Sequence, residues 1–113
     1  AADYADVVYL PTDNIAASNT EAIANVVIPA KVPVVAGEEG ICSGCGVATL
    51  SISYYDIGYK AGEMAYDILV NGKDPATMDI AFVPENKLTK EYDAARCKAL
   101  GVKVVDGYKA IES

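Results

Sequence analysis

The chain has 113 residues, of which 52% are hydrophobic, and it carries a net charge of −7 without a single histidine. This length and composition are typical of one small globular domain with a hydrophobic core, and they exclude a disordered chain. The acidic balance argues against a nucleic-acid partner, because binding to phosphates needs a basic surface. The lack of histidine removes the commonest general base and the commonest transition-metal ligand. No apolar run reaches the roughly 18 residues needed to span a membrane.

The first 36 residues predict a strand, a helix and a second strand. Residues 7–10 form a short apolar run, typical of a strand buried on both faces, and Pro11 ends it. Asp13 or Asn14 then caps a helix that is expected to reach about residue 28. The apolar run 32–36 is the second strand. Two strands joined by a helix predict a right-handed βαβ unit with parallel strands.

The rest of the chain alternates between further strands and helices. Four glycines predict a sharply bent loop over 37–46. A third strand at 47–52 leads to a helix over 54–70, whose apolar stripe is expected to lie against a sheet. Weaker strand signals at 80–83 and 88–92 precede a helix over 94–100 that ends at Gly101. We also expect a last helical turn within 106–113. The fold class is therefore α/β, a parallel sheet with flanking helices.

Polar residues follow the predicted strands, at the end of the sheet where α/β proteins bind ligands. Thr12, Asp13 and Asn14 follow the first strand, and they are candidate ligand contacts or simply helix caps. Glu38 and Glu39 follow the second strand. Adjacent side chains on extended backbone point to opposite sides, so we expect only one of them, Glu38, to face a ligand and hold a cationic group. The alternative is that both carboxylates are solvated.

Two further residues follow the third strand. Ser53 and Tyr54 are candidate ligand contacts, and Tyr54 and its neighbour Tyr55 are suited to grip a flat apolar ligand. Packing in the core is the alternative for either tyrosine. Nothing at recognisable spacing supplies a nucleophile or an oxyanion hole, so we expect no enzyme activity, no catalytic residue and no cofactor.

The three cysteines invite a metal or redox interpretation. Cys42 and Cys45 are spaced as in a C-x-x-C motif, but without histidine only Cys97 could add a third soft ligand, so we expect no metal site. The glycine-rich surroundings are also unlike a redox motif that opens a helix after a strand. We predict that the first two are free or loosely paired, and that Cys97 is a small core residue.

Several stretches together resemble one family. They occur in the order Val-Tyr-Leu-Pro-Thr-Asp-Asn (8–14), Val-Pro-Val-Val-Ala-Gly-Glu-Glu-Gly (32–40), Ala-Thr-Leu-Ser-Ile-Ser-Tyr-Tyr-Asp-Ile-Gly (48–58), Ala-Gly-Glu-Met-Ala (61–65) and Asn-Gly-Lys-Asp-Pro-Ala-Thr-Met (71–78). The chain resembles the C-terminal part of ABC-importer substrate-binding lipoproteins, and more narrowly the branch of tryptophan/tyrosine uptake proteins. The resemblance covers about residues 4–105.

This resemblance implies a partial type I periplasmic-binding-protein architecture, in which two lobes close on a small solute. Residues 1–45 would belong to the second lobe, 46–78 would cross to the first lobe, and 79–113 would return. The implied partners are an amino acid or similar solute and the subunits of an ABC permease. The implied location is extracytoplasmic, with a lipid anchor on the full-length parent. Two alternatives have other functions: the ligand-sensing domain of a transcription regulator with the same fold, and a small flavodoxin-like domain.

The chain starts one short step before a buried strand and shows no signal peptide, which indicates a fragment of a longer protein. By the resemblance, residues 47–72 belong to a lobe that is otherwise absent, so their apolar stripe would be uncovered. Exposed stripes and open strand edges favour association. We therefore expect the fragment to be a homo-oligomer in which 47–69 form much of the contact.

Overall fold

The computed structural model describes residues 2–111. They group into two compact units, the first formed by residues up to Ser51 and from Thr89 onward, and the second by Ile52–Leu88. The sequence predicts segment boundaries near 45 and 78, whereas the second unit begins and ends several residues later. That each of these units corresponds to one lobe of a two-lobe protein stays a prediction.

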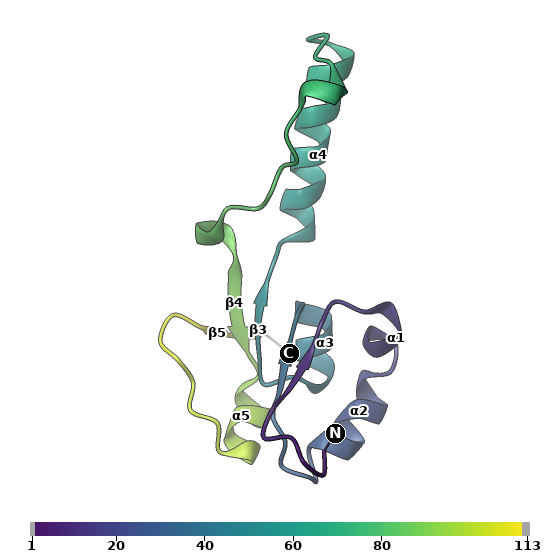
Figure 1. Cartoon of the computed structure of the whole chain (residues 1–113). Coiled ribbons are helices and arrows are strands. Elements are labelled where there is room, and N and C mark those ends of the chain that lie inside the picture. Colours follow the sequence, from purple (N-terminus) through teal and green to yellow (C-terminus); the bar gives the residue numbers. More distant parts are fainter. Residues whose placement is uncertain (1, 112–113) are drawn as a thin grey trace. The chain divides into compact units, whose positions relative to one another are not determined.

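The first unit is built on a five-stranded sheet (Figure 1). Its strands lie in chain order: β1 (Val8–Leu10), β2 (Val34–Ala36), β3 (Ala48–Ser51), β4 (Thr89–Tyr92) and β5 (Lys109–Ala110). The predicted α/β class is confirmed. The expected parallel pairing is found for β1 with β2 and for β2 with β3, whereas β4 runs antiparallel to β3. The reason is the route of the chain. It leaves the sheet after Ser51 and returns at Thr89, the residue that pairs with Ser51.

Two short helices stand where the sequence predicts one long helix between the first two strands. They are α1 (Asn14–Ala17) and α2 (Thr20–Val27). The hydroxyl of Ser18 donates to the Asn14 carbonyl and the amide of the Asn19 side chain donates to the Ile15 carbonyl, both at 2.8 Å. These side chains compete with backbone amides for the carbonyls of the first helix, which ends it early.

A helix also replaces the loop that the glycines predict over 37–46. It is α3 (Glu39–Cys45), and Glu38 caps it. The glycines serve close packing instead: a Cβ atom on Gly44 would lie 2.3 Å from the Cβ of Thr20 in α2. The core of the unit forms where α2 and α3 cover β2, and its buried members are Val27, Val34, Ala36, Ile41, Cys42 and Cys45.

The last part of the first unit is the helix α5 (Ala94–Leu100), which has the bounds that the sequence predicts. Gly101 ends it in the left-handed conformation at φ 68°, which glycine adopts without strain. Arg96 joins α5 to α3 through four backbone carbonyls at the end of α3: those of Cys42 (2.8 Å), Ser43 (2.6 Å), Gly44 (3.0 Å) and Gly46 (3.1 Å). The helical turn expected in the tail is wrong for its described residues, because Lys109–Ala110 pair with β4 instead.

The second unit consists of the helix α4 (Tyr54–Leu69) and a returning segment with two 3₁₀ turns, η1 (Pro75–Thr77) and η2 (Glu85–Lys87). The predicted helix is confirmed. The strand expected at 80–83 is wrong, since these residues have no ladder partner in the described part of the chain. The expected burial of the α4 stripe against a sheet is also wrong: the stripe faces the returning segment, and Ile57 keeps 38% of its surface exposed.

Candidate ligand-binding site

The turns that follow β1 and β2 lie against each other. The amide of Gly37 donates to the Leu10 carbonyl at 2.7 Å, and the hydroxyl of Thr12 lies 3.5 Å from the Gly37 carbonyl. A Cβ atom on Gly37 would lie 2.9 Å from the Thr12 nitrogen, so this close approach requires glycine. The structure thus brings the predicted site residues of both turns to one edge of the sheet.

Both acidic residues of these turns act as helix caps. One carboxylate oxygen of Asp13 accepts from the Ala16 amide at 2.8 Å. The Glu38 carboxylate uses both of its oxygens, accepting from the amides of Gly40 (2.9 Å) and Ile41. The capping alternative is therefore observed for Asp13, whereas the cap formed by Glu38 is a role that sequence reasoning missed. Their contact with a ligand stays a prediction, as it does for Thr12 and for Asn14, the exposed first residue of α1.

The other two predicted site residues, Ser53 and Tyr54, belong to the second unit. Ser53 caps α4 by accepting from the Asp56 amide at 3.2 Å. The ring of Tyr54 is not packed in a core, because 61% of the residue is exposed. Tyr55 is also exposed and stacks on Tyr59 with ring centroids 6.4 Å apart. The alternative of core packing is therefore not observed for either tyrosine in the second unit, because both are exposed.

Two polar residues that sequence reasoning missed lie on the same edge of the sheet as the strand-end turns. Ladder pairing aligns Leu10, Ala36, Thr49, Glu91 and Lys109 in one row across all five strands. Thr49 is fully buried, and within residues 2–111 neither its hydroxyl oxygen nor the Oε2 atom of Glu91 has a hydrogen-bond partner. The sequence could not reveal this pair, because the strand that carries Glu91 arrives about 40 residues after Thr49.

The pKa of the Glu91 carboxyl is raised above its ordinary value. Burial is the main cause, and the negative charge of Glu39 in α3 adds to it, while the positive charge of Lys109 opposes it. These residues therefore come close enough to interact from three elements: α3, β4 and β5. Acidic groups placed so that they repel each other favour binding of a cation.

The three cysteines are free and buried, which makes them core residues. Burial raises the pKa of the Cys42 thiol to about 12 and raises the pKa of Cys45 and Cys97 as well. A thiol with a raised pKa is a poor nucleophile and a poor metal ligand. In the part of the chain that the structure describes, no group of three or more cysteine, aspartate or glutamate residues could hold a metal ion.

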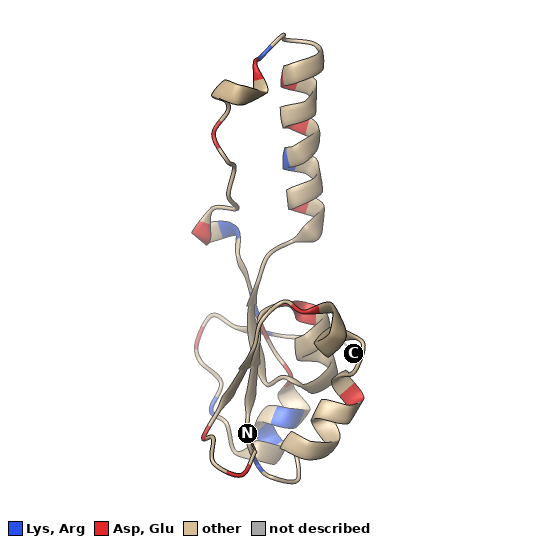
Figure 2. Cartoon of the chain, turned by 45° about the vertical axis from the view of Figure 1, so that its right-hand side comes forward, with Lys and Arg blue, Asp and Glu red and all other residues tan. Residues whose placement is uncertain are grey.

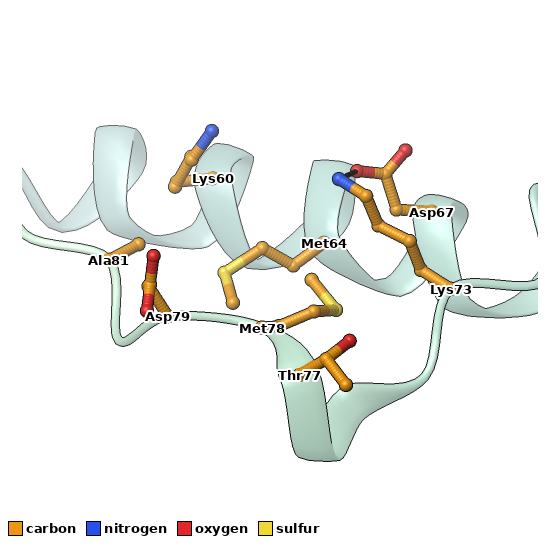
Figure 3. Close-up of a pocket in the computed structure, with 8 residues that line it drawn as sticks. All are labelled: Lys60, Met64, Asp67, Lys73, Thr77, Met78, Asp79 and Ala81. Carbon is orange, nitrogen blue, oxygen red and sulfur yellow. Dashed lines mark hydrogen bonds and ion pairs between the residues drawn. The ribbon is translucent and has the colours of Figure 1, made fainter.

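The second unit contains an open hollow of about 270 Å³ between α4 and the returning segment (Figure 3). Most of its charged groups already have partners. Lys73 pairs with Asp67 at 3.0 Å, Asn71 donates to the same carboxylate at 2.8 Å, and Lys60 pairs with Glu63 at 3.2 Å. The bonds from Lys73 and Asn71 lower the pKa of Asp67. A hollow whose charges are paired offers few free groups to a ligand, so we place the candidate site at the edge of the sheet.

Charge and hydropathy constrain the kinds of partner. Figure 2 shows the lysine and arginine positions interspersed with acidic ones over both units, and the whole chain has 9 basic against 16 acidic residues. Such a surface lacks the basic stripe that tracks a phosphate backbone. Among the described residues, no helix is long and apolar enough to cross a membrane.

Known proteins share both the sequence pattern and the fold of this chain. A family model described as ABC transporter substrate binding protein matches residues 1–106. The chain belongs to this family. A curated relative, a tyrosine-binding protein from Clostridioides difficile (strain R20291), is 32% identical to the chain over 108 residues, which cover 96% of the chain and 31% of the relative. The chain thus spans about a third of the length of that substrate-binding protein.

Solved structures share the fold of this chain. A ligand-free, open substrate-binding protein with adhesive properties from Clostridium difficile is 32% identical, with a TM-score of 0.69 over 94% of this chain and 36% of that one. A conserved domain protein from Vibrio cholerae is 26% identical, with a TM-score of 0.78 over 93% and 34% of the two chains. A domain from Streptococcus pneumonia in complex with L-Trp has a TM-score of 0.80 over 97% and 38%, at 20% identity. The partial substrate-binding-protein fold expected from the sequence is confirmed.

Proposed function

We propose that this chain forms part of the solute-binding component of an ABC importer, and that the solute is an amino acid with an aromatic side chain. The observation that carries the proposal is the 32% identity, over nearly the whole chain, to a tyrosine-binding protein. The family gives the class of protein, and the name of this relative supports an aromatic amino acid as the solute. Such a component binds and releases its solute without making or breaking a bond.

The site for the solute lies, in this proposal, at the edge of the sheet where the two strand-end turns meet. Thr12, Asp13, Asn14 and Glu38 are the proposed contacts in the first unit. Ser53 and Tyr54 stay predicted ligand contacts of the second unit, taken by itself. The exposed ring of Tyr54 is suited to stack on an aromatic solute. Binding of the solute would shift the population toward a form that is closed around a hinge, because the closed form makes extra contacts with the solute.

The partners and location follow from the same proposal. A permease in the membrane would receive the solute, and the binding component would work outside the cytoplasm, held there by a lipid anchor on the parent polypeptide. We infer no cofactor, because binding of this kind needs none.

Thermal unfolding in the presence of each amino acid tests the proposal on the longest natural polypeptide that contains this chain. Tyrosine, phenylalanine and tryptophan should raise the midpoint in a concentration-dependent way, since a ligand that binds only the folded state stabilises it. Alanine and aspartate are the controls. Calorimetry with L-tyrosine then gives the affinity. Equal midpoints with all amino acids, together with no heat of binding, would exclude the proposed solute class.

A further inference from the structure

We propose that Glu91, with Thr49 and Glu39 beside it, receives the ammonium group of the amino-acid ligand. The inference rests on the proposed function and deepens it, because it assigns the group that distinguishes an amino acid from other small aromatic solutes. The sequence alone favours Glu38 for this role. The structure offers a reason to look elsewhere, because both oxygens of Glu38 already accept amide hydrogen bonds from the first turn of α3.

The register of the sheet places the hydroxyl of Thr49 and the carboxylate of Glu91 together. Thr49 on β3 and Glu91 on β4 are directly paired across two antiparallel strands, so their side chains project from the same face of the sheet. Thr49 is completely buried on the face that α3 covers. Glu39, in the first turn of α3, is close enough to influence Glu91 through its charge. Two oxygen-bearing side chains from adjacent strands are therefore neighbours, and the charge of Glu39 acts on one of them.

Two side-chain oxygens of this cluster have no hydrogen-bond donor among the described residues. In the described part of the chain, the hydroxyl oxygen of Thr49 and the Oε2 atom of Glu91 are both buried and neither forms a hydrogen bond. A buried polar atom without a partner is costly, so a native protein keeps one chiefly where something else supplies the bond. An ammonium group has three donors and no acceptor. It can bond the Glu91 carboxylate and the Thr49 hydroxyl, and its positive charge would offset the repulsion between Glu39 and Glu91.

The cluster also lies where a ligand can reach it. Glu91 is in the same row across the sheet as Leu10 and Ala36, the last residues of β1 and β2. The turns that begin there carry Thr12 and Glu38, and Gly37 holds them in contact. Glu39 is exposed and Glu91 is half-buried, so the acidic side of the cluster is open to solvent. Lys109 on β5 is paired with Glu91 on β4, on the side of Glu91 that is away from Thr49.

The test compares two ligands that differ only in the ammonium group: L-tyrosine and 3-(4-hydroxyphenyl)propanoate. The substitution Glu91→Gln keeps the shape of the side chain and removes its charge. It should weaken L-tyrosine binding roughly 10- to 100-fold, the range for a lost charge-assisted hydrogen bond, and leave the affinity for the propanoate unchanged. Thr49→Val and Glu39→Gln should each weaken L-tyrosine binding by a smaller factor. Glu21→Gln, on the exposed start of α2, is the matched control.

A second readout separates a binding role from a structural one. Because the pKa of Glu91 is raised by burial and by Glu39, its charge costs stability when ionised. That cost is absent below the ordinary carboxyl pKa and is complete once the pH exceeds the raised pKa. Glu91→Gln should therefore raise the unfolding midpoint at pH 7 while it weakens binding. A residue kept for structure would lose stability when substituted.

The outcomes separate the inference from the proposed function. If the unsubstituted protein binds L-tyrosine and Glu91→Gln binds it equally well, the inference is overturned and the proposed function stands. The inference is also overturned if Glu38→Gln alone weakens binding of L-tyrosine and not of the propanoate, since the ammonium then lies on Glu38. If the unsubstituted protein binds no amino acid, the proposed function fails, and the inference fails with it.

Discussion

Arg96 is a partly buried charged side chain whose loss should cost the first unit much of its stability. Its guanidinium holds the four carbonyls at the end of α3 and also pairs with Asp93 at 3.0 Å. The end of a helix presents carbonyls without amide partners and a partial negative charge. Arg96→Met would remove the bonds that these carbonyls accept from the guanidinium, although the Cys42 carbonyl keeps the Gly46 amide at 2.9 Å. It would also leave Asp93, the N-cap of α5, without its counter-charge.

The expected loss is about 3 kcal/mol. Breaking a buried ion pair by removal of one partner costs about 3–5 kcal/mol. The Arg96 and Asp93 side chains are 20% and 22% exposed, so water partly compensates and the lower end of that range applies. Arg96→Lys keeps the charge but loses the planar fork that reaches several carbonyls at once, so an intermediate loss is expected. Lys73→Met is the matched control: its pair with Asp67 is exposed, and such pairs contribute about 0.2–1 kcal/mol.

Urea unfolding followed by circular dichroism measures these differences through the shift in midpoint at constant slope. We expect the order Arg96→Met, Arg96→Lys, Lys73→Met, from the largest loss to the smallest. A loss below about 1 kcal/mol for Arg96→Met would show that the helix end is solvated and that the arginine contributes no more than a surface charge. An equal loss for Arg96→Met and Arg96→Lys would show that the positive charge alone contributes nothing, whereas no loss for Arg96→Lys would show that the fork geometry has no role.

Three further outcomes test the packing, and a fourth tests association. Gly44→Ala should destabilise by about 1–3 kcal/mol, because its Cβ would overlap Thr20. Gly62→Ala, which meets nothing within 4 Å, should instead stabilise α4 by about 0.5–1 kcal/mol; denaturant titration measures both. The Cys42 thiol, with its pKa near 12, should react with a disulfide reagent at pH 8 only after urea is added, and rapid reaction of the folded chain would contradict its burial. Finally, we predict that the 113-residue chain self-associates through residues 47–69, and a concentration-independent monomer mass in sedimentation equilibrium would refute this.

The elements with strong local signals were predictable. The caps at Ser53 and Asp93 and the glycine after α5 are read from neighbouring residues, and the structure has each of them where the sequence places it. The errors arose where tertiary contacts decide. The glycines of α3 looked like loop residues because their packing partner, Thr20, is 24 positions before Gly44. Likewise, no local pattern shows that β4 will return beside β3 in the opposite direction.

Only those residues of the candidate site that directly follow a strand in the sequence could be predicted. Polar residues after a strand are visible in the sequence, so Thr12, Asp13 and Glu38 could be named. The use of Asp13 and Glu38 as caps follows from hydrogen bonds that depend on the turn geometry. Glu91 could not be named, because its burial and its neighbours come from an antiparallel strand pairing and from α3.

The pairing of Ser51 with Thr89 makes the second unit an insertion at the tip of a β-hairpin. In engineering terms, the chain can be shortened at one point without disturbing the order of strands in the sheet. A two-residue Asn-Gly turn can join antiparallel strands directly, so residues 52–88 could be replaced by such a turn. The shortened protein would keep the five-stranded sheet with α1, α2, α3 and α5. It would be a minimal scaffold on which the cluster around Glu91 could be studied by itself.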